Sequence, residues 1–192
     1  ALSLSKDISI MQNKPTTILL IRHGNTGKDP RTQLPADPLC KEGRAEVEKL
    51  AKFLNGYPIS AYFSSPYKRA LETAEIIAGE EKINVDSRLR EIPLWSDPVD
   101  LDEDEKRLEL TKILIEAQEG VEGVLENVQE NYPGKTVAFI CHGNIIRATL
   151  AFTLKMGLET AVRLQTYTAA VSIIERTPAG YYALRLFNSK PF

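Results

Sequence analysis

The hydrophobic pattern of the chain begins with four consecutive aliphatic residues, Ile18 to Ile21, which stop abruptly at Arg22. An unbroken apolar run of this kind predicts a strand that is covered on both faces, as in a parallel sheet between helices. A second apolar run, Val137 to Cys141, ends in the same way at His142. The two runs therefore predict two buried strands of one sheet.

Helical periodicity follows the first strand after a loop rich in proline and glycine. From Lys41 to Leu54, aliphatic residues recur at the spacing i, i+3, i+4 and i+7, and Asn55-Gly56 follows. This pattern predicts a helix with one buried face. The run Ile59 to Phe63 predicts another short strand. Ser65-Pro66 comes next and predicts a helix with Ser65 as its N-cap.

The rest of the chain continues this alternation of strands and helices. We expect a short strand at Ile83–Val85, followed by a helix that starts in the acidic run Asp102–Glu105. This helix is expected to be interrupted near Gly120 and to stop at Tyr132–Gly134. A buried helix at Asn144–Met156 and a hairpin of Val171–Ile174 and Tyr181–Phe187 complete the prediction. The order of the segments predicts an α/β fold, a three-layer αβα sandwich with a mainly parallel central sheet.

The length of 192 residues suits one domain with a full hydrophobic core. We expect this domain to span residues 15–192, with residues 93–131 as a helical cap over the functional site. Residues 1–14 are polar and irregular, and we expect them to form a flexible arm. The sequence therefore predicts one catalytic or binding unit and no linker between domains.

Composition excludes several classes of partner. The chain has 24 basic and 26 acidic residues, so its formal charge of −2 gives no global attraction to nucleic acid or anionic membranes. No apolar run approaches the roughly 18 residues of a membrane span, and no signal-peptide core is evident. The two cysteines, Cys40 and Cys141, are too few for a disulfide framework. These features predict a cytoplasmic protein. The sequence leaves open whether it is a monomer or a homodimer, because an exposed C-terminal edge strand could pair.

The candidate chemistry lies where the two buried strands end. The chain has two histidines, and each is followed by glycine at a strand end, as His23-Gly24 and His142-Gly143. Open α/β sheets place their ligands at this carboxyl edge. Arg22 precedes His23, and Arg69 lies near a predicted helix N-terminus, where anions are favoured. We therefore expect two imidazoles and these arginines to form one pocket, with Arg147 as a further candidate.

The positive charge of this pocket favours an oxyanion over a metal ion. A zinc site needs three or four ligands, and no cluster of Cys or His lies near the two histidines, while the arginines would oppose a cation. Guanidinium groups match the oxygens of a phosphate group instead. A neutral His23 could attack phosphorus, because the charge of the adjacent Arg22 disfavours the imidazolium form.

A leaving alkoxide also needs a proton. Glu91 is the candidate general acid, because it closes a short extended segment before a loop that could fold over the pocket. A bound phosphate dianion would raise its pKa and keep it protonated near neutral pH. The same carboxylate could then accept a proton from the attacking water. Asp97 is the alternative acid.

Three motifs together resemble the histidine phosphatase superfamily, also called the phosphoglycerate mutase-like family. They are Leu20-Ile21-Arg22-His23-Gly24-Asn25-Thr26, Ser64-Ser65-Pro66-Tyr67-Lys68-Arg69-Ala70 and Cys141-His142-Gly143-Asn144. The resemblance extends from about Thr17 to Asn188 and includes Leu71-Glu72-Thr73-Ala74 and Leu89-Arg90-Glu91. An ordered set of this kind is far more specific than a lone Arg-His-Gly.

The resemblance implies a role for each motif residue. It implies that His23 is the phosphorylated nucleophile and that Glu91 donates the proton. It also implies that a group of residues binds the phosphoryl group or borders it, namely Arg22, Arg69, His142, Asn25 and Asn144. No metal and no other cofactor is implied, and the implied substrate is a small phosphorylated metabolite.

Members of the family differ in the fate of the phosphohistidine. Mutases return the phosphoryl group to phosphoglycerate after priming by 2,3-bisphosphoglycerate, whereas phosphatases admit water. Mutases typically carry a Tyr-Gly near the acid and a longer insert with paired arginines. Here Glu91 is followed by Ile92-Pro93-Leu94-Trp95, and Asp97 to Glu109 is mostly acidic. This departure favours a phosphatase, although many phosphatases also have a glycine after the acid, which this chain lacks.

Two alternatives remain open from the sequence. One is phosphoglycerate mutase activity, with which His142-Gly143-Asn144 and Arg147 are also compatible. The other is a non-catalytic phosphate-binding module. The loops Lys28–Leu39 and Pro93–Lys112 would decide which substrate fits the pocket.

Overall fold

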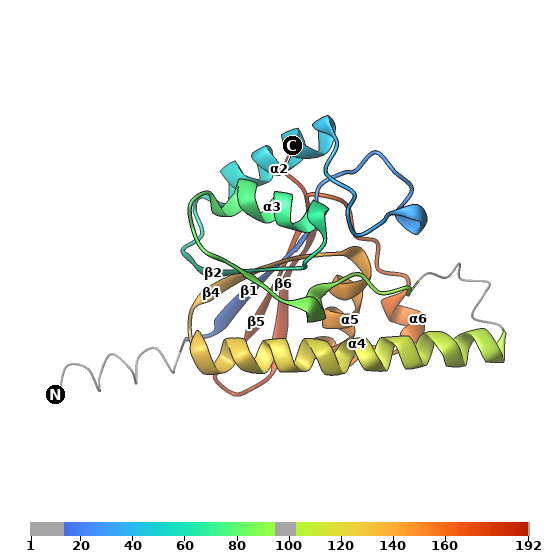
Figure 1. The fold of residues 1–192 in the computed structure, drawn as a ribbon. Helices are drawn as coiled ribbons and strands as arrows, with labels where there is room; N and C mark the ends of the chain where they lie inside the picture. The colour runs from blue at the N-terminus through green and yellow to red at the C-terminus, as the bar shows by residue number, and fades with distance from the viewer. Residues whose placement is uncertain (1–13, 95–102, 192) are drawn as a thin grey trace.

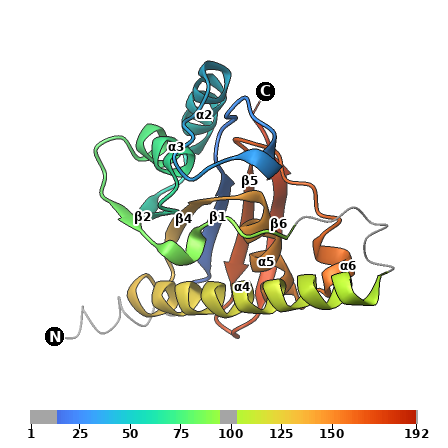
Figure 2. The same cartoon turned by 45° about the vertical axis from the view of Figure 1, so that its right-hand side comes forward.

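The computed structural model describes residues 14–94 and 103–191. A six-stranded sheet in the order β3-β2-β4-β1-β5-β6 forms its centre. Helices α2 and α3 cover one face of the sheet, and α4 and α5 cover the other (Figure 1). The same three layers are visible in the turned view (Figure 2). The predicted three-layer αβα fold is therefore confirmed.

The strands and helices have the following bounds. The strands are β1 (Thr16–Arg22), β2 (Ile59–Ser64), β3 (Ile83–Val85), β4 (Thr136–Cys141), β5 (Val171–Arg176) and β6 (Tyr182–Ser189). The α-helices are α2 (Lys41–Leu54), α3 (Lys68–Ala78), α4 (Asp104–Asn131), α5 (Gly143–Leu154) and α6 (Leu158–Ala161), and the short 3-10 helices are η1 (Pro30–Thr32) and η2 (Ser87–Leu89).

The unbroken apolar run of β1 packs against both helical layers. Ile18 and Leu20 join the cluster formed with α4 and α5, while Leu19 and Ile21 join the cluster formed with α2 and α3. All four side chains are at most 1% exposed. Successive side chains of a strand point to opposite faces, so a strand between two helical layers needs apolar residues at every position.

Parallel pairing brings the two predicted strand ends together. β1 pairs in parallel with β4, and Arg22 lies opposite Cys141 in the register. The next residues along the two strands are His23 and His142. Because β2 and β3 are also parallel to β4, their carboxyl ends lie at the same edge of the sheet. β5 and β6 complete the sheet as the predicted antiparallel hairpin.

The predicted start of α3 is wrong by two residues. Tyr67, not Ser65, is the N-cap, and the helix begins at Lys68. The hydroxyl of Ser65 accepts a hydrogen bond from the backbone N–H of Tyr67 and contacts His142 instead of capping the helix. The first helical N–H, that of Lys68, donates to the carbonyl of Pro35 in the loop after β1. A tertiary contact thus replaces the local cap.

Helix α4 is continuous, so the predicted interruption near Gly120 is wrong. It runs over 28 residues and ends at the predicted stop, with Tyr132 as C-cap. Its acidic first turn is present at Asp104 and Glu105. Gly120 and Gly123 face Arg88, whose side chain occupies the space beside the helix. The two glycines therefore make room for the Arg88 side chain and do not interrupt the helix.

Part of the predicted organisation stays a prediction. The C-terminal half of α4 packs against the sheet through Val121, Val124 and Val128. The proposed cap over residues 93–131 includes Trp95 and Asp97, which lie outside the described residues, as does nearly all of the arm over residues 1–14. Helix α6 was not predicted. No helix in the described ranges is long and apolar enough to cross a membrane.

The glycine after each histidine allows a close approach. A Cβ on Gly24 would lie 2.7 Å from the carbonyl oxygen of Gly43, in the first turn of α2. A Cβ on Gly43 would lie 2.0 Å from the carbonyl oxygen of Asn25. The loop after β1 and the start of α2 therefore touch backbone to backbone, and this contact fixes the direction in which the chain leaves His23.

Replacing Gly43 with alanine should destabilise the fold, because the new methyl group would meet backbone atoms that cannot rotate away. We expect the free energy of unfolding to fall by about 1–3 kcal/mol, the usual range for overpacking, as measured by urea denaturation. Gly56→Ala is the matched control, because a Cβ there meets nothing within 4 Å. Equal stability of the two variants would contradict the close backbone contact.

Candidate functional site

The two histidines meet at the carboxyl edge of the sheet. The backbone N–H of His23 donates to the carbonyl of Cys141 at 3.0 Å, which continues the pairing of β1 with β4 by one residue. The ring centroids of His23 and His142 are 5.1 Å apart, with an angle of 62° between the rings. Both residues are 0% exposed. The predicted juxtaposition of the two imidazoles is therefore present.

The hydrogen bonds of His23 define which nitrogen carries its proton. Nδ1 lies 2.8 Å from the carbonyl oxygen of Gly24, which can only accept. Nε2 accepts a hydrogen bond from Nε of Arg69 at 3.1 Å. The neutral ring consequently carries its proton on Nδ1 and holds a lone pair on Nε2. Of the two nitrogens, Nε2 is the one suited to nucleophilic attack.

Burial keeps His23 unprotonated. Burial, the largest cause, and the charges of Arg22 and Arg69 together lower the pKa of His23 to about 3, while the hydrogen bond to Gly24 opposes them. The predicted effect of Arg22 has the right direction, although burial contributes more. The ring is therefore neutral throughout the range near pH 7.

Arg69 is a buried cation held beside His23. It is the second residue of α3 and is 2% exposed. Nη1 donates to the carbonyl of Leu34 at 2.9 Å, so the loop after β1 packs onto it. Its guanidinium carbon lies 5.1 Å from the centre of the Tyr67 ring. Burial lowers the pKa of Arg69, but nearby carboxylates, with Glu91 the largest, oppose this.

Arg22 reaches the opposite side of the pocket. Its Nη1 donates to the carbonyl of Thr166, which precedes β5. Its Nε is buried and has no hydrogen-bond partner in the described part of the chain. A Cβ on Gly143 would lie 2.7 Å from the hydroxyl oxygen of Thr166, so the glycine after His142 leaves room for the residue whose carbonyl holds Arg22. Arg22 therefore presents an unused buried donor.

His142 occupies the N-cap position of α5. Its Nε2 lies 2.8 Å from the hydroxyl oxygen of Ser65. Its Nδ1 is buried and has no partner among the described residues. Burial lowers the pKa of His142, and the positive character of His23, Arg69 and Arg22 lowers it further. The ring is therefore neutral and has one nitrogen left over for a ligand.

Glu91 lies at the start of the same helix. Its Oε1 accepts hydrogen bonds from the backbone N–H groups of Ile92 and Asn144, both at 3.2 Å. Burial raises the pKa of Glu91 to about 7, although Arg22, the N–H of Ile92 and Arg69 lower it in part. A carboxyl group with this pKa can both donate and accept a proton near neutral pH. The raised pKa was predicted from a bound phosphate, but burial alone produces it.

The two predicted asparagines are engaged by the protein. Oδ1 of Asn25 accepts from the backbone N–H of Gly27 at 2.8 Å. Nδ2 of Asn144 donates to the carbonyl of Ile92 at 2.9 Å, and its Oδ1 accepts from Nη1 of Arg147. Asn144 thus ties the Glu91 segment to α5. Contact of either side chain with a phosphoryl group stays a prediction.

Arg147 lies one helical turn after His142. Its Nε donates to the carbonyl of Leu164 at 2.7 Å, and burial lowers its pKa. It borders a cavity of about 200 Å³ together with Arg22 and Tyr167. Arg147 therefore lies beside the pocket and is held by two protein groups.

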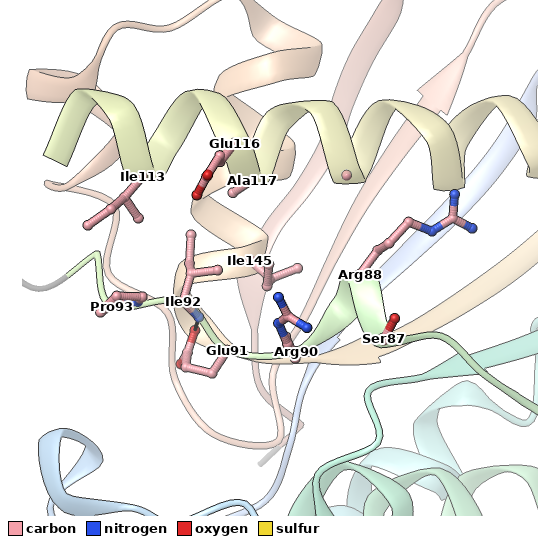
Figure 3. Close-up of a pocket in the computed structure, with 11 residues that line it drawn as sticks. Ser87, Arg88, Arg90, Glu91, Ile92, Pro93, Ile113, Glu116, Ala117 and Ile145 are labelled. Carbon is pink, nitrogen blue, oxygen red and sulfur yellow. Dashed lines mark hydrogen bonds between the residues drawn. The ribbon is translucent and has the colours of Figure 1, made fainter. Parts of the chain in front are cut away.

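A larger cavity of about 490 Å³ lies between α4 and the chain segment that carries Glu91 (Figure 3). Ile113, Ala117 and Ile145 supply apolar lining. Arg90 and Glu116 supply charged groups to the same cavity. The Glu91 segment thus borders this cavity on one side and contacts the start of α5 on the other. The alternative acid, Asp97, lies outside the described residues.

Two contributors to the site were not assigned from the sequence. The hydroxyl of Thr73 accepts from the backbone N–H of Gly24 at 3.1 Å and donates to the carbonyl of Arg69 at 2.7 Å, so it links the His23 turn to α3. Ser65 contacts His142. Both lie in quoted motifs, which is the only signal that the sequence offered. Within residues 14–94 and 103–191, no group of three His, Cys, Asp or Glu is placed to hold a metal ion.

The comparison with known proteins finds both mutases and phosphatases. The chain is 29% identical to a 2,3-bisphosphoglycerate-dependent phosphoglycerate mutase of Thermoplasma acidophilum, over 82% of the chain and 86% of the mutase. It is 27% identical to a probable 2-carboxy-D-arabinitol-1-phosphatase of Arabidopsis thaliana, over 84% of the chain but 38% of that longer protein.

Solved structures share the fold. A phosphoserine phosphatase variant from Entamoeba histolytica, in complex with phosphoserine, superposes with a TM-score of 0.76 at 22% identity, covering 91% of this chain and 97% of that one. The family model of the histidine phosphatase superfamily (branch 1) matches residues 18–189, which include His23, Arg69, Glu91 and His142. The chain belongs to the histidine phosphatase superfamily.

Proposed function

We propose that the protein is a phosphatase that hydrolyses phosphomonoesters through a phosphohistidine intermediate on His23, without a metal. The observation that carries the proposal is the state of His23. Its Nε2 is a buried, unprotonated nitrogen in contact with a buried guanidinium group. A neutral nucleophile surrounded by fixed positive charge suits attack on a phosphate dianion.

In the first step, Nε2 of His23 attacks phosphorus and the ester bond to the leaving oxygen breaks. The proposed donors to the phosphoryl oxygens are Arg69, which contacts Nε2 of His23, together with Nε of Arg22 and Nδ1 of His142, which are buried without partners in the described part of the chain. In the free protein, Nε–H of Arg69 donates a hydrogen bond to Nε2 of His23. When the dianion binds, this N–H would donate to a phosphoryl oxygen instead. Glu91 gives its proton to the leaving alkoxide, so the products are an alcohol and phosphohistidine.

In the second step, water attacks the phosphohistidine. Glu91, now a carboxylate, takes one proton from this water as the oxygen bonds to phosphorus. The bond between phosphorus and Nε2 breaks, which regenerates neutral His23 and releases inorganic phosphate. Oε1 of Glu91 is held by two backbone N–H groups, so Oε2 is the oxygen that would carry the proton.

A small phosphorylated metabolite is the proposed substrate class. The similar structures of the Entamoeba histolytica phosphatase hold phosphoserine and 3-phosphoglyceric acid, which supports a compact anionic substrate. The chain that follows Glu91 has no Tyr-Gly, and the run that begins Asp102-Glu103-Asp104-Glu105 is acidic. These two departures from the mutase pattern favour water as the acceptor.

Phosphoglycerate mutase activity is the second candidate. The observation that favours it is the 29% identity to the archaeal mutase over most of both chains. It would require 2,3-bisphosphoglycerate to phosphorylate His23 first, whereas the proposed phosphatase needs no cofactor. The two activities share the phosphohistidine and differ in what removes the phosphoryl group.

Two assays separate these activities. We expect the protein to release inorganic phosphate from p-nitrophenyl phosphate and from phosphometabolites in excess chelator. We also expect the rate of conversion of 3-phosphoglycerate to 2-phosphoglycerate to be no higher than the rate of hydrolysis of 3-phosphoglycerate, both with and without 2,3-bisphosphoglycerate. Efficient primer-dependent conversion would identify a mutase instead. Phosphate binding without turnover of any ester would identify a binding module.

Replacing Arg69 with alanine should lower kcat by about 10²–10³, as does the loss of one donor to a developing oxyanion. The variant loses the group that contacts Nε2 of His23 and would bind a phosphoryl oxygen. Steady-state kinetics with p-nitrophenyl phosphate measures the change. Arg185→Ala is the matched control, because Arg185 is exposed on β6 and pairs with Glu175. An Arg69→Ala enzyme within a few-fold of wild type would remove Arg69 from the site.

The pH dependence tests Glu91. Its protonated form is needed for leaving-group departure, so kcat/KM for an alkyl phosphate should decline as pH rises through about 7. Glu91→Gln should lose this decline and lower the rate by about 10²–10⁴, the contribution of general acid catalysis. The loss should be much smaller for p-nitrophenyl phosphate, because nitrophenolate leaves without a proton. Equal losses for the two substrates would assign the proton transfer to another residue, with Asp97 the next to test.

A further inference from the structure

His142 has an unusual pair of surroundings. One ring nitrogen, Nε2, lies 2.8 Å from the hydroxyl oxygen of Ser65, whereas the other, Nδ1, is buried without a partner in the described part of the chain. A neutral imidazole has one N–H donor and one lone pair. Whether His142 can donate to a phosphoryl group therefore depends on which nitrogen carries the proton.

The hydrogen bonds of Ser65 decide this question. The hydroxyl oxygen of Ser65 already accepts from the backbone N–H of Tyr67 at 3.2 Å. Ser65 is 0% exposed, so no bulk water reaches its hydroxyl. Its hydroxyl proton has one acceptor within reach among the described groups, Nε2 of His142. The serine therefore donates, and the histidine accepts.

The opposite arrangement would leave two groups unmatched. If His142 carried its proton on Nε2, this N–H and the N–H of Tyr67 would both point at the Ser65 oxygen. The hydroxyl proton of Ser65 would then have no acceptor, and Nδ1 of His142 would present a buried lone pair. A lone pair at Nδ1 would also repel a phosphate oxygen. Buried polar groups without partners are costly, so this arrangement is disfavoured.

We propose that Ser65 is a positioning residue that holds His142 in the Nδ1–H tautomer, so that Nδ1 donates a hydrogen bond to the phosphoryl group that His23 attacks. This inference rests on the proposed function. Both histidines then carry the proton on Nδ1, but one serves as the nucleophile and the other as a hydrogen-bond donor. His23 directs its Nδ1–H to the carbonyl of Gly24 and keeps Nε2 as a nucleophile. His142 uses its lone pair on Ser65 and keeps Nδ1–H for the ligand.

The lowered pKa of His142 agrees with this assignment. A cationic ring would carry protons on both nitrogens and would need no partner to select one. Because burial keeps the ring neutral in the free protein, a single proton has to be placed, and the hydroxyl of Ser65 places it. The neighbouring Tyr67 ring, 5.1 Å from the His142 ring, makes no hydrogen bond that would compete.

The tautomer can be measured directly, because the chain contains two histidines. A long-range ¹H–¹⁵N correlation spectrum of the ¹⁵N-labelled protein shows four ring nitrogens, which His23→Gln and His142→Gln variants assign. In the wild type, we expect a protonated Nδ1 and an unprotonated Nε2 for His142. A wild-type His142 with its proton on Nε2 would overturn the proposal, and this result requires no folded Ser65 variant.

Ser65→Ala should change this spectrum selectively. We expect His142 to gain a population with the proton on Nε2, while His23 keeps its tautomer because its partners are unchanged. Ser64→Ala is the matched control. Its hydroxyl donates to the carbonyl of Ser65 at 3.0 Å and does not contact His142, so the His142 tautomer should persist. Ser65→Thr keeps the hydroxyl and should retain the wild-type tautomer. An unchanged His142 in Ser65→Ala would overturn the proposal.

Kinetics should show that Ser65 acts through His142. Ser65→Ala should lower kcat/KM by about 10-fold or more, up to the 10²–10³ expected for losing the donor itself. In a His142→Ala background, the same substitution should cost less than about 2-fold, because the ring it positions is gone. Equal losses in both backgrounds would overturn the proposal. Absence of turnover in the wild type would instead refute the proposed function, and inorganic phosphate binding would then replace kcat/KM as the measured quantity.

Discussion

The parallel pairing of β1 with β4 is the constraint on which the site depends. It places Arg22 opposite Cys141, so the next residue on each strand is a histidine. The pairing is stable because β1 and β4 are covered by helices on both faces, and their side chains are almost completely buried. The positions of the two imidazoles therefore follow from the hydrophobic core. Arg22 at the end of β1 and Arg69 in the first turn of α3 add the positive charge, and Glu91 follows η2.

Burial then determines the chemistry that these groups can perform. It lowers the pKa of His23 to about 3 and raises the pKa of Glu91 to about 7. The same burial leaves Nε of Arg22 and Nδ1 of His142 without partners in the described residues. Each such group costs the free protein about 1–3 kcal/mol. A bound phosphate dianion would satisfy both groups.

The sequence predicted the core and the convergence of the site because their causes are local. The apolar run Ile18–Ile21 has no alternation, and this property follows directly from burial on both faces. The reason for the glycines could not be predicted. Gly24 and Gly143 permit close approaches to Gly43 and Thr166, and such contacts depend on how distant segments pack.

Other features depend on partners that have no sequence signature. Arg22 and Arg69 are held by the backbone carbonyls of Thr166 and Leu34, and every residue has a carbonyl. Ser65 looked like a helix cap because Ser-Pro commonly starts a helix. Its hydroxyl contacts His142 instead, and only the fold reveals that a residue 77 positions away along the chain lies within reach.

The most direct test of the account is rapid acid-free quenching of the enzyme during turnover of a ³²P-labelled phosphomonoester, followed by mapping of the labelled residue. The account predicts a phosphoryl group on Nε2 of His23 that forms and decays at least as fast as steady-state turnover. Turnover with no labelled protein, or with the label on His142, would contradict it.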